Sequence, residues 1–193
     1  MKLEPKVLEN RFVRLEPMAE THRAAFRAAC DADLATWNEL YPYAMGGEHF
    51  DGGWARLYAE PGADRTNYAV MVGGRCMGVS SHLGIDPSNQ VLEIGGTYYH
   101  PDVRGGAVNP ACKRLLLEHA FDAGVRRVQF KVDAKNARSR AAVLKLGATQ
   151  EGILRQDRVC WTGRIRDTVF FSILADEWPT VRERLDSRLM AFA

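Results

Sequence analysis

The chain has 193 residues, of which 46% are hydrophobic and 26% are charged, a composition typical of one globular domain rather than a disordered chain. Its 26 Lys and Arg against 24 Asp and Glu give a net charge of +2, which excludes an overall attraction to nucleic acid or to an anionic membrane. No stretch reaches the roughly 20 apolar residues of a membrane span, and the first residues do not resemble a signal peptide. We therefore expect a single cytoplasmic domain over residues 1–193.

The four cysteines stand alone in the sequence, with no C-x-x-C pair among them: Cys30, Cys76, Cys112 and Cys160. This spacing indicates reduced thiols rather than a disulfide framework or a zinc site. We expect no metal ion.

Charge is unevenly distributed along the chain. Residues 101–166 hold 14 Lys and Arg against 6 Asp and Glu, a net charge of +8, so the rest of the chain carries 12 − 18 = −6. Such a segment is either a set of solvated helix faces or the binding site of a polyanion. Its basic residues scatter over predicted helices and strands without interleaved aromatic residues, and we therefore do not expect nucleic-acid binding.

The elements predicted for the first half follow from apolar periodicity and from turn residues. In chain order they are a strand over 12–15, a helix capped by Thr21 that runs to about Cys30, a loop with short helical pieces over 31–53, a helix over 54–59 ended by residues 60–62, and a hairpin of 68–72 and 75–83 around Gly73-Gly74.

The second half predicts, in order, a strand over 91–99 after the turn at 86–89, a helix over 110–123, a strand over 128–133, a helix over 138–146 ended by Gly147, strands over 152–161 and 167–174, and a helix after Pro179 with Val181, Leu185, Leu189 and Phe192 on one face. This order predicts an α+β (mixed α/β) domain around a largely antiparallel sheet.

A glycine-rich turn joins the strand over 91–99 to the helix that follows. Residues 104–110 read Arg-Gly-Gly-Ala-Val-Asn-Pro, in which Asn109 suits an N-cap and Pro110 suits the first helical position. A strand, a glycine-rich turn and a helix N-terminus together favour anion binding, because free N–H groups converge there. The turn is neither a Walker A loop nor a dinucleotide fingerprint.

The block from Val128 to Gly152 contains a strand, Asn136-x-x-Ser139 at the start of a helix, and then Leu146-Gly147-Ala148-x-x-Glu151-Gly152. With Glu93-Ile94-Gly95 in the earlier strand, this block resembles the GNAT superfamily of acetyl-CoA-dependent N-acetyltransferases, and most of all the branch of the ribosomal-protein N-terminal acetyltransferases. The resemblance extends over nearly the whole chain, from Arg14-Leu15-Glu16-Pro17 to Glu177-Trp178.

The resemblance implies a mostly antiparallel sheet of about seven strands, flanked by helices, with a V-shaped splay between two central parallel strands. Gly95-Gly96 fits a bulge that starts such a splay. The resemblance also implies acetyl-CoA as co-substrate, with its pyrophosphate at the turn and the helix start. The residues implied in binding are Thr97, Tyr98, Arg104, Gly105, Gly106, Ala107, Val108, Asn109, Lys113, Asn136, Arg138 and Ser139.

In the family, an amine attacks the thioester directly. The implied roles are Glu93 as the base acting through water, a backbone N–H near Thr97 or Tyr98 for the oxyanion, and Ser139 as a weak general acid. Asn136 is expected to orient the CoA arm. A covalent route through Cys112 is disfavoured, because a thiol on a packed helix face is inert.

The acceptor is expected to be a small amine or a protein N-terminus. Trp37, Tyr41 and Tyr43 in the early loop and Trp161 in the last hairpin are the acceptor-side candidates, and core packing explains each of them as well. Asp102 and Pro110 depart from the family pattern, so a catalytically silent CoA-binding sensor of the same fold stays open as the alternative. A monomer and a homodimer are both compatible with the sequence.

Overall fold

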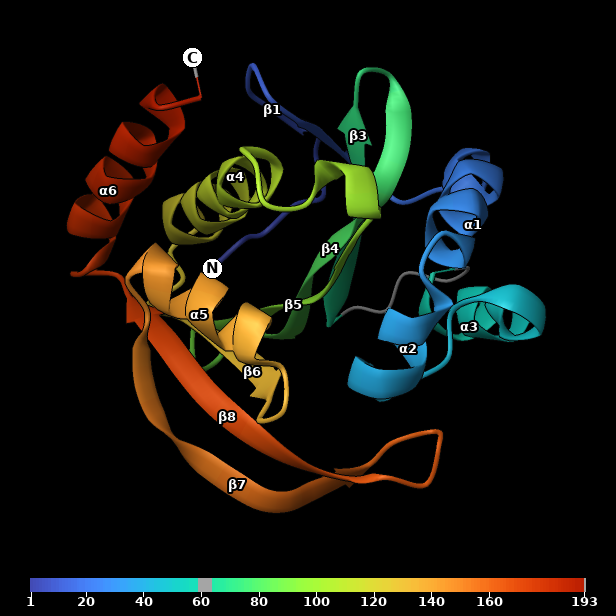
Figure 1. Cartoon of the computed structure of the whole chain (residues 1–193). Helices are drawn as coiled ribbons and strands as arrows, with labels where there is room; N and C mark the ends of the chain where they lie inside the picture. Colours follow the sequence, from blue (N-terminus) through green and yellow to red (C-terminus); the bar gives the residue numbers. More distant parts are fainter. Residues whose placement is uncertain (59–63, 193) are drawn as a thin grey trace.

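The structure is a computed structural model that describes residues 1–58 and 64–192. An eight-stranded sheet runs through the molecule in the order β1-β2-β3-β4-β5-β6-β8-β7 (Figure 1). Neighbouring strands pair in antiparallel fashion except β5 and β6, which are parallel. The strands are β1 (Leu8–Glu9), β2 (Arg14–Pro17), β3 (Arg65–Val72), β4 (Arg75–Asp86), β5 (Val91–Tyr99), β6 (Arg127–Asp133), β7 (Thr149–Val159) and β8 (Ile165–Leu174).

Helices cover both faces of this sheet (Figure 1). Those of the described chain are α1 (Arg23–Asp31), α2 (Leu34–Leu40), α3 (Phe50–Leu57), α4 (Val108–Asp122), α5 (Ala137–Leu146) and α6 (Trp178–Met190), with short 3-10 turns η1 (Glu20–His22), η2 (Gly47–His49) and η3 (Pro101–Val103). The predicted mixed α/β domain with a mostly antiparallel sheet is confirmed. The sequence does not predict β1, because two residues are too few to show alternation.

Two separate hydrophobic cores hold the layers together. The larger core joins α4, α5 and α6 to one face of the sheet, with Leu92, Leu116 and Phe171 among its fully buried members. The smaller core joins α1, α2 and α3 to the other face, around Phe26 and Trp37. Because side chains alternate along a strand, residues of β5 reach different cores: Leu92 and Ile94 belong to the larger core, and Tyr98 to the smaller.

The predicted hairpin of β3 and β4 is present, with Gly73 and Gly74 at φ +55° and +77°, the left-handed values that this turn requires. Gly147 ends α5 at φ +100°, as predicted. The predicted helix over 54–59 is α3, which begins earlier, at Phe50; its predicted end at residues 60–62 lies outside the described residues.

Two predicted helix caps are wrong. Thr21 lies inside η1, ahead of α1, and so caps nothing. Asn109 is already the second residue of α4, which begins at Val108 with Ala107 as an N-cap that has no side-chain bond. Pro110 is therefore the third helical residue, where its missing N–H breaks no intrahelical bond.

An ion pair closes the sheet where β6, β8 and β7 lie side by side. Arg127 of β6 donates to both carboxylate oxygens of Glu151 on β7, at 2.6 and 2.5 Å, and Ser172 of β8 donates to one of them at 2.8 Å. The Arg127 guanidinium is the main reason that the pKa of Glu151 falls to about 2. The carboxylate thus stabilises the fold in its ionised form.

Replacing Glu151 by Gln is expected to destabilise the protein at neutral pH. The carboxylate is partly exposed, so solvent screening limits the loss to about 1 kcal/mol. A lowered folded-state pKa gives stability that is complete above the unfolded pKa near 4.5 and is lost as the pH falls toward 2. Urea unfolding between pH 7 and pH 3 should therefore show the gap to the parent protein closing. A gap that stays constant with pH would contradict the ionic origin of the effect.

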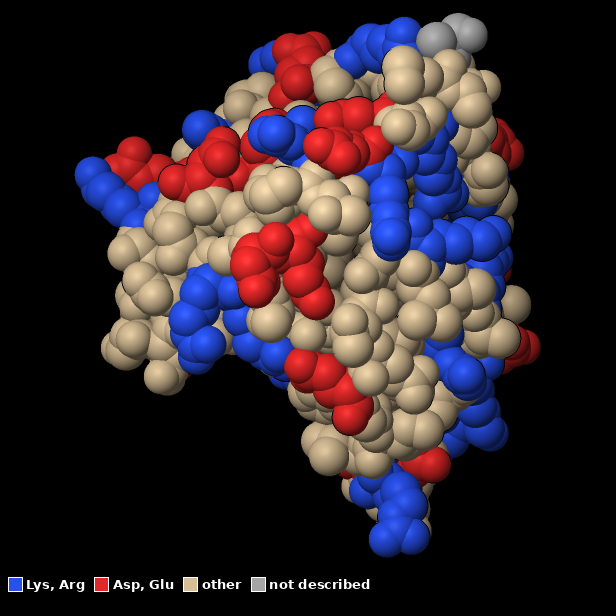
Figure 2. Space-filling model, turned by 90° about the vertical axis from the view of Figure 1, so that its left-hand side faces the viewer, with Lys and Arg blue, Asp and Glu red and all other residues tan. Residues whose placement is uncertain are grey.

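Charge does not form a single-sign field on the side of the molecule seen in Figure 2: basic and acidic side chains are interspersed there. Within residues 1–58 and 64–192, no helix combines the length and apolar character of a membrane span. The same residues include no group of three or more His, Cys, Asp or Glu side chains arranged to hold a metal ion.

Candidate functional site

The two parallel strands separate after three paired positions. β5 and β6 pair from Val91 with Arg127 to Glu93 with Gln129, yet β5 continues to Tyr99 and β6 to Asp133. Beyond Glu93, β6 keeps its pairing with β8, while β5 keeps its pairing with β4. The predicted V-shaped splay is thus present, and it leaves strand edges on both sides with backbone groups available to a ligand.

A bulge in β5 accompanies the splay. Val79 of β4 pairs with Tyr98 and Ser81 pairs with Gly95, so that Gly96 and Thr97 together oppose one residue. Gly96 has φ +59°, and a side chain on Gly95 would overlap the Glu93 carboxylate. The two glycines predicted to form this bulge are required, one for its conformation and the other for the close approach of Glu93.

Glu93 is the last paired residue of β5 and lies at the apex of the V. Because Leu92 and Ile94 enter the core beneath α4, the Glu93 side chain projects to the opposite face, which carries α1, α2 and α3. Its carboxylate is 15% exposed and lies 3.0 Å from the ammonium of Lys131 on β6. A carboxylate in this place is reachable by a molecule bound between the helices and the splay.

Aromatic residues of the α2 segment pack against the bulge. The Tyr41 hydroxyl donates to the Thr97 carbonyl, and a side chain on Gly96 would lie 3.6 Å from the Tyr43 hydroxyl. Burial raises the pKa of Tyr43 to about 12, so this phenol is neutral at physiological pH. Trp37 is 1% exposed and stacks on Tyr98 at 4.5 Å. Trp37 is therefore a core residue beneath the site.

The β7–β8 hairpin forms the other wall of this face. Trp161, 39% exposed, bonds through its backbone N–H to Pro42 and through Nε1 to the Trp37 carbonyl. Arg164 donates to Asp133 at the end of β6, at 2.5 Å. The hairpin and the α2 segment, far apart in sequence, thus meet over the open end of the V, near the lower part of Figure 1.

The glycine-rich turn lies at the end of β5 and leads into α4. Gly105 adopts φ +81°, and an added side-chain atom at either Gly105 or Gly106 would meet nothing within 4 Å. The first N–H groups of α4 have no intrahelical partner. The turn and helix start thus offer open space next to backbone donors, the arrangement that suits an anion.

Arg104 does not point freely into this space. Its Nη1 pairs with Asp33 at 2.5 Å and its Nε donates to the Tyr99 carbonyl at 2.8 Å. Asp33 also caps α2 by accepting from the Thr36 N–H. Arg104 therefore anchors the turn to α2, and the predicted phosphate contact is replaced by a structural one. No local sequence signal reveals this pair, since its members are 71 residues apart.

Lys113 also differs from its prediction. The side chain is 5% exposed, and its ammonium donates to Thr97 Oγ1 at 2.6 Å and to Ser80 Oγ at 2.9 Å. It points into the sheet rather than toward the turn, so its geometry does not fit a phosphate contact.

The start of α5 lies at the end of β6, across the splay. Asn136 caps this helix by accepting from the Ser139 N–H at 2.9 Å. Ser139 is half-buried and Arg138 is exposed. Cys112 lies fully buried in α4, and burial raises its thiol pKa, which agrees with an inert cysteine.

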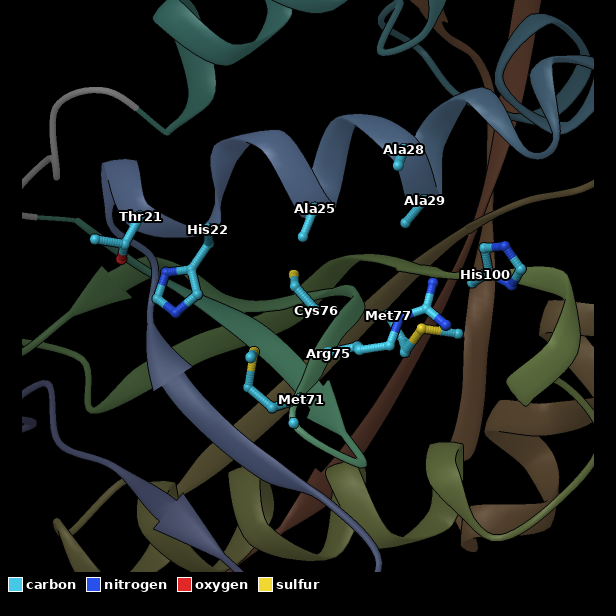
Figure 3. A pocket seen from close by; sticks show the side chains of 11 residues that line it. Thr21, His22, Ala25, Ala28, Ala29, Met71, Arg75, Cys76, Met77 and His100 are labelled. Carbon is cyan, nitrogen blue, oxygen red and sulfur yellow. The ribbon is translucent and has the colours of Figure 1, made fainter.

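A cavity of about 290 Å³ lies elsewhere, between α1 and the start of β4 (Figure 3). Small residues of α1 and the side chains of Met71, Cys76 and Met77 line it. None of the predicted site residues contributes to it.

The family profile described as the acetyltransferase (GNAT) domain matches residues 13–149. This chain belongs to the GNAT acetyltransferase family. A crystal structure from T. thermophilus, titled provisionally an acetyltransferase, is 38% identical with a TM-score of 0.87, and the match covers 98% of this chain and 100% of that one.

Two further relatives connect the acetyltransferase to the predicted branch. YdaF of Bacillus subtilis (strain 168), named provisionally a ribosomal N-acetyltransferase, is 27% identical over 125 residues, which are 65% of this chain and 67% of YdaF. Mycobacterium smegmatis RimJ, solved in complex with CoA-disulfide, shares the fold at 20% identity and a TM-score of 0.79, over 95% of this chain and 94% of RimJ.

Proposed function

We propose that this acetyltransferase moves the acetyl group of acetyl-CoA directly to an amine, either a protein N-terminus or a small amine. One observation carries the proposal: the apex of the β5–β6 splay presents Glu93 on one face of the sheet, while the anion-binding turn opens beside α4 on the other. A long phosphorylated thioester can pass through the splay and expose its reactive end to Glu93. The CoA complex of RimJ supports this assignment of the co-substrate.

The residues around the turn fit the phosphate end of acetyl-CoA. The backbone N–H groups of Gly105, Gly106 and Ala107 and of the first helical residues, Val108 and Asn109, would hold the pyrophosphate. On the opposite side of the splay, Asn136 and the exposed Arg138 would hold the CoA arm and its ribose phosphate.

The chemistry requires little more than positioning and proton transfer. The bound co-substrate supplies an acetyl thioester, and the chain's N–H groups near Thr97 and Tyr98 stabilise the negative charge that develops on its oxygen. Glu93 accepts, through water, the proton that the attacking ammonium must lose. Tyr43 and Trp161 border the entry of the amine.

Ser139 donates a proton to the departing thiolate. A thiolate is a stable leaving group, because its pKa is about 8.5, and it needs little assistance. Replacing Ser139 by Ala is therefore expected to lower kcat by about tenfold or less without changing the affinity for acetyl-CoA. Steady-state kinetics at saturating acetyl-CoA checks this, and a loss larger than that of the Glu93 variant would contradict the assignment.

Calorimetric titration with acetyl-CoA in moderate salt tests the proposed co-substrate. We expect one site per chain, with weaker binding of a CoA analogue that lacks the 3′-phosphate. Binding without turnover on any amine would favour a silent sensor of this fold, and absence of binding would overturn the proposal.

A further inference from the structure

The ammonium of Lys113 is buried at the boundary between α4, β4 and β5. It donates to Thr97 Oγ1 at 2.6 Å and to Ser80 Oγ at 2.9 Å, and these two hydroxyls lie 2.8 Å from each other. The three groups form a closed triangle. One corner is the side chain of Thr97, which belongs to the β5 bulge.

This ammonium has no counter-charge. Among the ion pairs of the described residues none includes Lys113, and the titratable groups that face it come from its own helix and from two strands: Cys112 on α4, His82 on β4, and Tyr99 on β5 beside Cys112. Burial raises the pKa of the Cys112 thiol and of the Tyr99 phenol, and it lowers the pKa of His82 to about 3. All three are neutral at physiological pH, so the ammonium is the one charge among these four groups.

A buried, unpaired charge destabilises a fold, and a methionine of similar length would fill the same space. Packing alone therefore does not explain this lysine. What distinguishes the position is Thr97, whose carbonyl receives the Tyr41 hydroxyl from one face of the sheet while its side chain receives the ammonium from the other. Both ends of the residue are held.

We propose that Lys113 is a positioning residue for acetyl transfer: it fixes the bulge through Thr97 and places a positive charge behind the peptide groups that hold the thioester oxygen. This inference rests on the proposed function of the splay. The charge lies in a medium of low dielectric, where its field on a developing oxyanion is stronger than in water. Its effect is therefore greatest in the transition state and small on binding.

Lys113→Met tests the inference, with Lys145→Met on the exposed surface of α5 as the matched control. Lys113→Met is expected to lower kcat by about 10- to 100-fold, while the calorimetric Kd for acetyl-CoA changes by less than about twofold and the Tm does not fall. Lys145→Met should match the parent protein in all three. An unchanged kcat in Lys113→Met, or a parallel loss of binding and Tm, would overturn the inference.

The pH profile gives a readout that a packing role would not move. Burial lowers the pKa of Lys113 to about 8, so kcat of the parent protein should decline above this pH as the charge is lost, and Lys113→Met should lack that decline. If Lys113→Met does not fold, Thr97→Val removes the hydroxyl that receives the ammonium and should lower kcat in the same way, whereas Thr97→Ser retains most of it. Binding and turnover by the parent protein test the proposed function separately.

Discussion

Glu93→Gln is expected to lower kcat for acetyl transfer by about 10²- to 10⁴-fold, the usual contribution of a positioned general base. The amide keeps the shape of the side chain at the apex of the splay and removes its ability to accept a proton. Because the carboxylate projects to the face opposite the anion-binding turn, the Kd for acetyl-CoA should stay within about twofold of the parent value.

Steady-state kinetics with saturating acetyl-CoA, together with calorimetry, check the result. Glu183→Gln on the exposed surface of α6 is the matched control, since it removes the same charge far from the splay. A Glu93 variant with full activity would exclude this carboxylate as the base. A variant that no longer binds acetyl-CoA would indicate instead a structural role for the Lys131 ion pair.

The second large effect is expected at Gly106. A methyl group there meets no protein atom within 4 Å, and the residue has no left-handed φ, so Gly106→Ala should fold with an unchanged Tm. If the open space receives the pyrophosphate, the methyl group should weaken acetyl-CoA binding by about tenfold, which corresponds to about 1.4 kcal/mol. Gly106→Glu adds a negative charge as well and should weaken binding by more than about 100-fold.

Gly152→Ala on β7 is the control for this series, because its added methyl group also meets nothing within 4 Å. Calorimetry and thermal unfolding of the three variants separate a lost ligand contact from a lost fold. Unchanged affinity in Gly106→Glu would show that the phosphates bind elsewhere.

Elements whose signals are local could be predicted from the sequence. The β3–β4 hairpin follows from Gly73-Gly74 between two apolar runs, and the bulge from Gly95-Gly96 inside a strand. The start of α4 lies two residues earlier than predicted, because Asn109 and Pro110 both suit a helix start, whereas the turn continues into the helix at Val108 without a side-chain cap.

The site residues whose contacts differ from the prediction depend on partners across the fold. Arg104 is predicted to bind a phosphate, but its partner Asp33 is supplied by α2. Trp37 is predicted on the acceptor side, but Tyr98 of β5 covers it. For Lys113 a signal exists: it precedes Leu116 and Leu117 by three and four residues, the helical spacing of one face, and both leucines are fully buried. The mixed composition of α4 conceals this second buried face.

The most direct measurement of the proposed activity follows both products of transfer in one reaction. The protein is mixed with acetyl-CoA and with peptides whose N-terminal amine is either free or blocked, and free thiol and acetylated peptide are quantified together. We expect one thiol released for each acetyl group gained, with the acetyl group on the free N-terminal amine or on the amine of a small-molecule panel. Tight binding of acetyl-CoA with no acetylated amine in any reaction would contradict the proposed function.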